Sequence, residues 1–249
     1  MTKGNIQSVE RAFYILEAIA SSNGMGVTEI SNSLNLNKST AFGLIKTLES
    51  LGYIFKNWET DKYKLTYKFA TLVSEGSLND ELVQFSKPYL DELSKKYNET
   101  IHFVAGTKDE VYYLEKIESK RSIRVYTGIG QSRPLYCTAV GKAILSMRSK
   151  DEIEEYIKHN KLERHTQNTI IDSSELMSDL EKARKNGYAI DNCESQDELY
   201  CIGVPIMNKM GEGYFALSIS FPVFRKSEHN LDEMIQDLLE TKENIERFF

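Results

Sequence analysis

The stretch Asn37-Lys-Ser-Thr-Ala-Phe-Gly-Leu-Ile-Lys-Thr-Leu-Glu-Ser-Leu-Gly52 determines the fold of the first part of this 249-residue chain. Its apolar residues recur at helical spacing, which predicts a helix that begins after Asn37, a suitable N-cap, and runs to about Leu51. Gly52 ends the pattern. The helix has two distinct faces: Ala41, Leu44, Ile45, Leu48 and Leu51 form the apolar one, whereas Ser39, Gly43, Lys46 and Ser50, flanked by Thr40, Phe42 and Thr47, form the opposite one.

Two helices precede this segment and two short strands follow it. Apolar residues at helical spacing predict a first helix over 8–21, and a short second helix begins near Thr28. Strands over 53–57 and 62–66 flank a polar turn. Three helices and a hairpin predict a winged helix-turn-helix, which we place in residues 1–66.

The polar face of the third helix has the composition of a surface that reads DNA. A helix enters the major groove only if this face is small and free of the core, and Ser39 and Gly43 permit a close approach. Lys46 can pair with a phosphate or a guanine edge. The alternative is that the face is only solvated and that Phe42 packs on the hairpin. We predict DNA contacts for Thr28, Ser39, Thr40, Phe42, Gly43, Lys46, Lys62 and Lys64.

Charge is distributed unevenly along the chain, whose net charge is −6. Residues 1–72 carry eight Lys and Arg against six Asp and Glu, which leaves 23 basic and 31 acidic residues for the remainder. We call residues 1–72 the head and the remainder the body. A mildly basic head on an acidic body is consistent with a protein in which only the head contacts phosphate.

The composition also argues against several classes of protein. The chain has no apolar run of about 18 residues for a membrane span, and its first residues lack the apolar stretch of a secretory signal. Three cysteines without CxxC spacing and four scattered histidines argue against a disulfide framework or a zinc cluster. We therefore expect a cytoplasmic protein with no membrane partner, no metal and no cofactor.

The remainder of the chain mixes helices and strands and predicts an α+β domain over 80–249, after a helical connector over 67–79. The predicted helices are 80–97, 137–147, 151–159, one that Asp172 caps and that ends at Asn186, and a closing amphipathic helix with residues from Leu231 to Ile245 inward. The predicted strands are 100–106, 111–117, 122–127, 188–191, 201–207 and 214–221.

Two of these strands carry small residues at alternate positions. If strands 201–207 and 214–221 pair as a hairpin, their small, weakly polar side chains share one side of the sheet and leave room for a small ligand. The alternative is a sheet face that helices cover. The two alternating sets are Cys201, Gly203, Pro205 and Met207 in one strand and Tyr214, Ala216, Ser218 and Ser220 in the other.

Several segments resemble the IclR family of bacterial transcriptional regulators, and the resemblance covers nearly the whole chain. In the head, the matching segments are Ser8-Val-Glu-Arg-Ala, Thr28-Glu-Ile-Ser, Leu36-Asn-Lys-Ser-Thr, Leu48-Glu-Ser-Leu-Gly-Tyr and Lys62-Tyr-Lys-Leu. In the body they are Arg133-Pro-Leu-Tyr-Cys-Thr-Ala-Val-Gly-Lys-Ala-Ile-Leu, Gly187-Tyr-Ala-Ile-Asp, Cys201-Ile-Gly-Val-Pro-Ile and Ala216-Leu-Ser-Ile-Ser. The chain departs from the family pattern at Asn37, at Tyr136 and at Glu198-Leu-Tyr.

The resemblance implies a GAF-like body that binds a small metabolite, often a carboxylate or an aromatic acid, and a transcriptional repressor that this effector controls. It also implies a homodimer or a dimer of dimers bound to a palindromic operator in double-stranded DNA. By the resemblance, the effector contacts are Ala139, Val140, Asp191, Cys201, Ser218 and Ser220. The backbone N–H groups at 139 and 140, at a helix N-terminus, suit a carboxylate.

Other functions are compatible with parts of this pattern. GAF-like folds also include a methionine-sulfoxide reductase that works through cysteines, so a cysteine-dependent enzyme is the alternative. The strongly acidic segment around Cys193 opposes thiolate formation and argues against it. A body that serves only for dimerisation is a further possibility, and His102 is interpreted as an ordinary strand residue.

Overall fold

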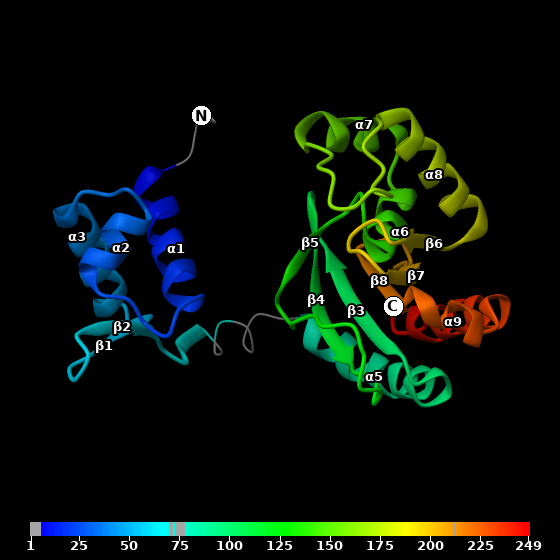
Figure 1. Ribbon diagram of the computed structural model, residues 1–249, viewed down its shortest axis with the longest axis horizontal. Coiled ribbons are helices and arrows are strands. Elements are labelled where there is room, and N and C mark those ends of the chain that lie inside the picture. Colours follow the sequence, from blue (N-terminus) through cyan, green and yellow to red (C-terminus); the bar gives the residue numbers. More distant parts are fainter. Residues whose placement is uncertain (1–5, 70–71, 73–77, 212) are drawn as a thin grey trace. The chain divides into compact units, whose positions relative to one another are not determined.

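The computed structural model describes residues 6–69, 72, 78–211 and 213–249, and the chain divides into two compact units, Met1–Ser77 and Leu78–Phe249 (Figure 1). Most of the predicted helical connector over 67–79 lies outside the described residues, so it stays a prediction, as do the domain limits at 66 and 80. None of the described helices is long and apolar enough to cross a membrane.

The first unit has the predicted three helices and hairpin. Its elements are α1 (Gln7–Ala20), α2 (Val27–Ser33), α3 (Lys38–Ser50) and the antiparallel strands β1 (Ile54–Asn57) and β2 (Lys62–Leu65). The apolar faces of the helices and the inner side of the hairpin form one core. Tyr63 fastens the hairpin to the helices, because its backbone exchanges hydrogen bonds of 2.8 and 3.1 Å with Met25 and its side chain is buried.

The second unit is built on a six-stranded antiparallel sheet in the order β5-β4-β3-β8-β7-β6, which confirms the predicted α+β class. The strands are β3 (Thr100–Gly106), β4 (Glu110–Ile117), β5 (Ser132–Pro134), β6 (Ala189–Asn192), β7 (Leu199–Ile206) and β8 (Phe215–Pro222). The helices are α5 (Leu78–Tyr97), α6 (Ala139–Met147), α7 (Lys150–His159), α8 (Ser173–Asn186), the short 3-10 helix η1 (Val223–Glu228) and α9 (Leu231–Glu246).

Helices cover both faces of the sheet (Figure 1). On one face, Ile101, Ile202 and Leu217 belong to a buried cluster with side chains of α5 and α9. On the other face, Val104 and Ala216 belong to a cluster with side chains of α6, α7 and α8. Because the side chains of a strand alternate between faces, this second face also receives the small polar residues of β7 and β8.

The pairing of β7 with β8 confirms the predicted hairpin and its shared side. Cys201 lies opposite Ser220, and Gly203 lies opposite Ser218. In an antiparallel pair, opposite residues point to the same face of the sheet. The small side chains therefore form one continuous wall, as the alternation predicts.

The strand predicted over 122–127 is wrong. This segment is irregular, and its side chains Ile123 and Tyr126 are 62% and 84% exposed. Strand β4 pairs instead with the later strand β5, where Val111 lies opposite Arg133. The alternation of polar and apolar residues imitates a half-buried strand, but here the apolar side chains belong to a loop that passes over the sheet.

The N-terminus of α6 lies directly against strand β7. Thr138 caps the helix, because its Oγ1 accepts a hydrogen bond of 3.1 Å from the Gly141 N–H. Gly203 is the residue of β7 at the contact. A Cβ there would lie 2.7 Å from the carbonyl carbon of Ala139 and 2.9 Å from the Val140 nitrogen, so only glycine fits.

We expect Gly203→Ala to destabilise the second unit by about 1–3 kcal/mol, because the new methyl group would push α6 away from β7. Gly128→Ala is the control, since a Cβ at Gly128 would meet only the movable side chain of Gln131. Thermal unfolding followed by circular dichroism measures both variants. A Gly203→Ala protein as stable as the control would contradict the close contact.

Candidate DNA-binding surface and effector pocket

Helix α3 buries its apolar face and exposes its polar one. Ala41 and Ile45 are fully buried, and Leu48 is 6% exposed. Leu51, predicted on the apolar face, is 51% exposed, because α3 ends at Ser50 and Leu51 is its C-cap. Of the predicted DNA-contacting residues, Thr28, Ser39, Phe42, Gly43 and Lys46 are exposed, and Thr40, Lys62 and Lys64 are partly buried.

Two features leave this surface open to a ligand. Phe42 is 48% exposed and is not among the side chains of the hydrophobic core formed by the described head residues. Asn37 occupies the predicted N-cap position of α3 but makes no side-chain cap hydrogen bond. The N–H groups of the first turn are therefore uncapped, which is the arrangement that binds phosphate at a helix N-terminus.

The three predicted lysines are held by polar side chains of the head itself. Their partners are Glu49 for Lys46 (2.7 Å), Glu29 for Lys62 (3.2 Å) and Asn23 for Lys64 (3.1 Å). The Glu49 carboxylate raises the pKa of Lys46, which is charged at neutral pH. Exposed contacts of this kind contribute little to stability, so a phosphate group can replace the protein partner at little cost.

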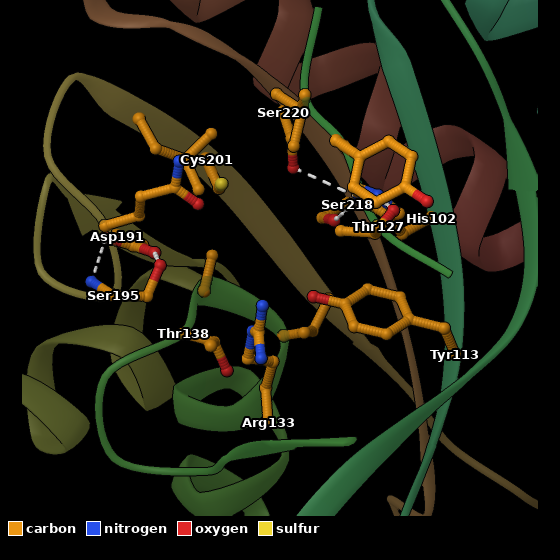
Figure 2. A pocket seen from close by; sticks show the side chains of 16 residues that line it. His102, Tyr113, Thr127, Arg133, Thr138, Asp191, Ser195, Cys201, Ser218 and Ser220 are labelled. Carbon is orange, nitrogen blue, oxygen red and sulfur yellow. Dashed lines mark hydrogen bonds between the residues drawn. The ribbon is translucent and has the colours of Figure 1, made fainter. Parts of the chain in front are cut away.

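A small pocket, part of it open to solvent, lies between the sheet and the N-terminus of α6 (Figure 2). All six predicted effector residues line it, although they come from four separate elements: Ala139 and Val140 from α6, Asp191 from β6, Cys201 from β7, and Ser218 and Ser220 from β8. The structure brings these residues together, and their contact with an effector stays a prediction.

The pocket also contains residues that the sequence did not single out. His102 of β3 lies opposite Ser218 and lines the pocket, so it is more than an ordinary strand residue. Period-two alternation places His102 on the side away from Ile101 and Phe103, but only the pairing of β3 with β8 shows that this side faces the pocket. The further lining residues that were not singled out are Tyr113, Val125, Tyr126, Thr127, Arg133, Thr138, Ser195, Gln196 and Leu199.

His102 lies within a cluster of hydroxyl groups (Figure 2). Its Nε2 is 2.9 Å from Thr127 Oγ1, and its Nδ1 is 3.3 Å from Ser220 Oγ and 3.5 Å from Ser218 Oγ. Burial, with a contribution from the charge of Lys116, lowers the pKa of His102 to about 3. The imidazole is therefore neutral at pH 7, and this end of the pocket offers hydrogen bonds without charge.

Asp191 organises the loop on another side of the pocket. Its Oδ1 accepts hydrogen bonds from the N–H groups of Glu194 (2.7 Å) and Ser195 (3.3 Å), and its Oδ2 accepts one from the Ser195 hydroxyl (2.5 Å). Burial raises the pKa of this carboxyl group. Asp191 thus positions Ser195, and only the remaining lone pairs of its oxygens can accept from an effector hydroxyl.

The first two backbone N–H groups of α6 are hydrogen-bond donors at the edge of the pocket. The N–H groups of Ala139 and Val140 donate to no acceptor among the described residues. The Thr138 hydroxyl is bonded to the Gly141 N–H and leaves them unpaired. Unpaired N–H groups and the helix dipole together favour an anion at this end of the pocket.

A buried ion pair fastens the pocket loop to α6. The Lys142 side chain is 1% exposed, and its Nζ lies 2.6 Å from Glu194 and 2.8 Å from Asp179. Burial raises the pKa of Glu194 to about 7, and its second carboxylate oxygen has no hydrogen-bond partner among the described residues. Because Glu194 belongs to the loop that Asp191 organises, this pair holds that wall of the pocket in place.

The cysteines lack the features of a nucleophile. Burial raises the pKa of Cys201 and of Cys193, and raises that of Cys137 to about 12. All three groups are therefore neutral thiols at pH 7, the less reactive form. Within the part of the chain that the structure describes, no three side chains gather as ligands for a metal ion.

Residues 77–247 match the family described as "Bacterial transcriptional regulator IclR C-terminal", and residues 8–57 match the "IclR helix-turn-helix domain". The HTH-type transcriptional regulator KdgR of Escherichia coli K12 is 36% identical over 231 residues, which are 93% of this chain and 88% of KdgR. The DNA-binding transcriptional repressor YiaJ of the same strain is 28% identical over 243 residues, 96% of this chain and 86% of YiaJ.

A solved structure shows the same fold. It is an IclR homologue from Microbacterium hydrocarbonoxydans in complex with 4-hydroxybenzoate, and it superposes with a TM-score of 0.83 at 20% identity. The match covers 96% of this chain and 98% of that one, so it includes both units.

We expect Lys142→Met to destabilise the second unit by about 3–5 kcal/mol, because it leaves the buried Glu194 carboxylate without its cation. Lys150→Met is the matched control, since the Lys150 side chain is 74% exposed and lies 3.9 Å from its carboxylate partner. Urea unfolding at pH 8, where Glu194 is ionised as long as Lys142 is present, measures both variants. Without Lys142, which lowers the pKa of Glu194, the buried group must take up a proton or remain an unpaired charge. Equal unfolding midpoints would mean that the buried pair does not hold the loop.

Proposed function

The chain belongs to the IclR family of bacterial transcriptional regulators, and we propose that it is a repressor whose operator affinity is controlled by a small organic acid. One observation carries the proposal. The same chain has an exposed, uncapped recognition helix, α3, and a separate pocket in which six effector residues predicted from the sequence converge. Each unit has its own core.

In this proposal, α3 lies in the major groove of the operator. A Cβ at Gly43 would meet nothing within 4 Å, so the described chain leaves room for base-pair edges there. Ser39 and the uncapped N–H groups bind a backbone phosphate, and Lys46 leaves Glu49 for a phosphate or a guanine edge. The hairpin lysines Lys62 and Lys64 then contact the flanking backbone.

The effector in this proposal binds between α6 and the sheet. Its carboxylate accepts from the N–H groups of Ala139 and Val140, which have no acceptor among the described residues. Ser218 and Ser220 donate to further oxygens of the effector, and Cys201 shapes the wall between them and Asp191. The thiols are neutral and no nucleophile is activated, so we propose a binding function rather than catalysis.

The effector can control DNA binding only if its affinity differs between two arrangements of the DNA-binding units in the oligomer. We propose a homodimer, or a dimer of dimers, that places two copies of α3 on the half-sites of a palindrome. A ratio of roughly 100 between the two affinities corresponds to about 2.7 kcal/mol of coupling. Repression is the proposed sign of control because the relative YiaJ is named a repressor. The bacterial cytoplasm, where the DNA lies, is the proposed location.

We expect Lys46→Ala to weaken operator binding by about tenfold, because it removes one charge-assisted contact worth about 1–3 kcal/mol. The operator is selected by the wild-type protein from random duplexes, and fluorescence anisotropy at fixed salt gives the affinity. Lys150→Ala, in the second unit, is the control and should bind as the wild type does. Unchanged binding by Lys46→Ala would show that the recognition surface is misassigned.

We expect Gly43→Ala to separate operator binding from folding. Alanine stabilises a helix interior by up to about 1 kcal/mol relative to glycine, and the added methyl group has open space in the described chain. The same methyl group would meet the DNA, so operator affinity should fall while the melting temperature of the head stays equal or rises. Unchanged operator affinity would contradict a close approach of α3 to base pairs.

A further inference from the structure

The side chains around the pocket are mostly hydrogen-bonding groups. Seven of the sixteen lining residues carry a hydroxyl group, and four more carry an imidazole, a guanidinium, a carboxylate or an amide. Only Val125, Val140 and Leu199 offer branched apolar side chains. Both aromatic rings of the lining, Tyr113 and Tyr126, carry hydroxyl groups, so the pocket offers more hydrogen-bonding groups than the apolar surface that an aromatic acid would bury.

Arg133 is a cation at this pocket that forms no ion pair with a described residue. It lies on β5, opposite Val111, and Figure 2 shows its side chain reaching toward the space between Thr138 and Tyr113. No hydrogen bond or ion pair joins its guanidinium to any described residue. A guanidinium binds a carboxylate through two parallel hydrogen bonds. Together with the N–H groups of α6, it makes one end of the pocket attractive to an anion.

The opposite end favours hydroxyl groups over a second anion. The neutral His102 and the hydroxyls of Ser218, Ser220 and Thr127 can each donate or accept a hydrogen bond, as a ligand hydroxyl can. On another side of the pocket, the buried carboxylate of Asp191 can accept from a hydroxyl but repels a carboxylate. The pocket thus has one anionic subsite and one hydroxyl subsite.

We propose that Arg133 is the carboxylate anchor of the effector and that the effector is a polyhydroxylated monocarboxylic acid, such as a sugar acid. Its carboxylate binds Arg133 and the N–H groups of α6, and its hydroxyl groups bind His102, Ser218 and Ser220. This inference rests on the proposed function and narrows the organic acid to one chemical class.

The class is tested with three panels of probes on the full chain. The first contains five- and six-carbon aldonic, 2-ketoaldonic and uronic acids, the second contains benzoate and its hydroxylated derivatives, and the third contains the neutral aldoses. We expect titration calorimetry to show that one or more sugar acids bind at least tenfold more tightly than every compound of the other two panels. A tighter aromatic acid or neutral sugar, or no binding by any sugar acid, would overturn the inference.

The anchor is tested with Arg133→Gln, which keeps the length and polarity of the side chain and removes its charge. We expect the affinity for the best sugar acid to fall at least tenfold and the melting temperature without ligand to stay unchanged. Arg133→Lys should recover part of the affinity. Arg247→Gln, at the end of α9 on the opposite face of the sheet, is the matched control. Wild-type affinity in Arg133→Gln would overturn the assignment.

Operator binding, measured on the same samples, distinguishes a failure of the proposed effector class from a failure of the proposed regulatory function. If the protein binds its operator and an aromatic acid releases it while sugar acids do nothing, the inference about the effector fails and the proposed function stands. If no duplex is bound with sequence specificity in any condition, the proposed function fails, whatever binds in the pocket.

Discussion

The contact between the backbone of α6 and that of β7 at Gly203 is the constraint on which the second unit depends. It places the N-terminus of a helix against a sheet, so two unpaired N–H groups face a wall of small side chains. It also aims Lys142, one turn further along α6, at Glu194 in the pocket loop. A wider separation would move Lys142 away from Glu194 and leave a buried charge without its partner.

The head obeys a separate constraint. Helix α3 must bury Ala41 and Ile45 in the core and still keep Gly43 and Ser39 uncovered, which a helix achieves because its two faces are chemically distinct. The two units have separate cores, so any control of one by the other is a difference in binding free energy between arrangements of whole units.

The predictions were correct for segments in which buried and exposed residues alternate with a single helical or strand period. The helical period of α3 separated its core face from its exposed face, and the period of two in β7 and β8 identified the wall that includes Ser218 and Ser220. The same rule failed over 122–127, because an exposed loop can alternate as a strand does. Alternation also did not identify His102 and Arg133 as pocket residues. It predicts which face of a strand a side chain lies on, but not which strand pairs with that strand.

The sequence by itself determined the winged helix-turn-helix and the α+β class through local spacing, and the family through the order of short segments. The six predicted pocket residues followed from the family resemblance and not from spacing. Only the tertiary structure decided which of these residues meet. The pairing of β3 with β8 brings His102 to Ser218, and the pairing of β5 with β4 brings Arg133 to the pocket. Such pairings join residues far apart in the chain, and their free energy depends on the packing of the whole sheet rather than on any one segment.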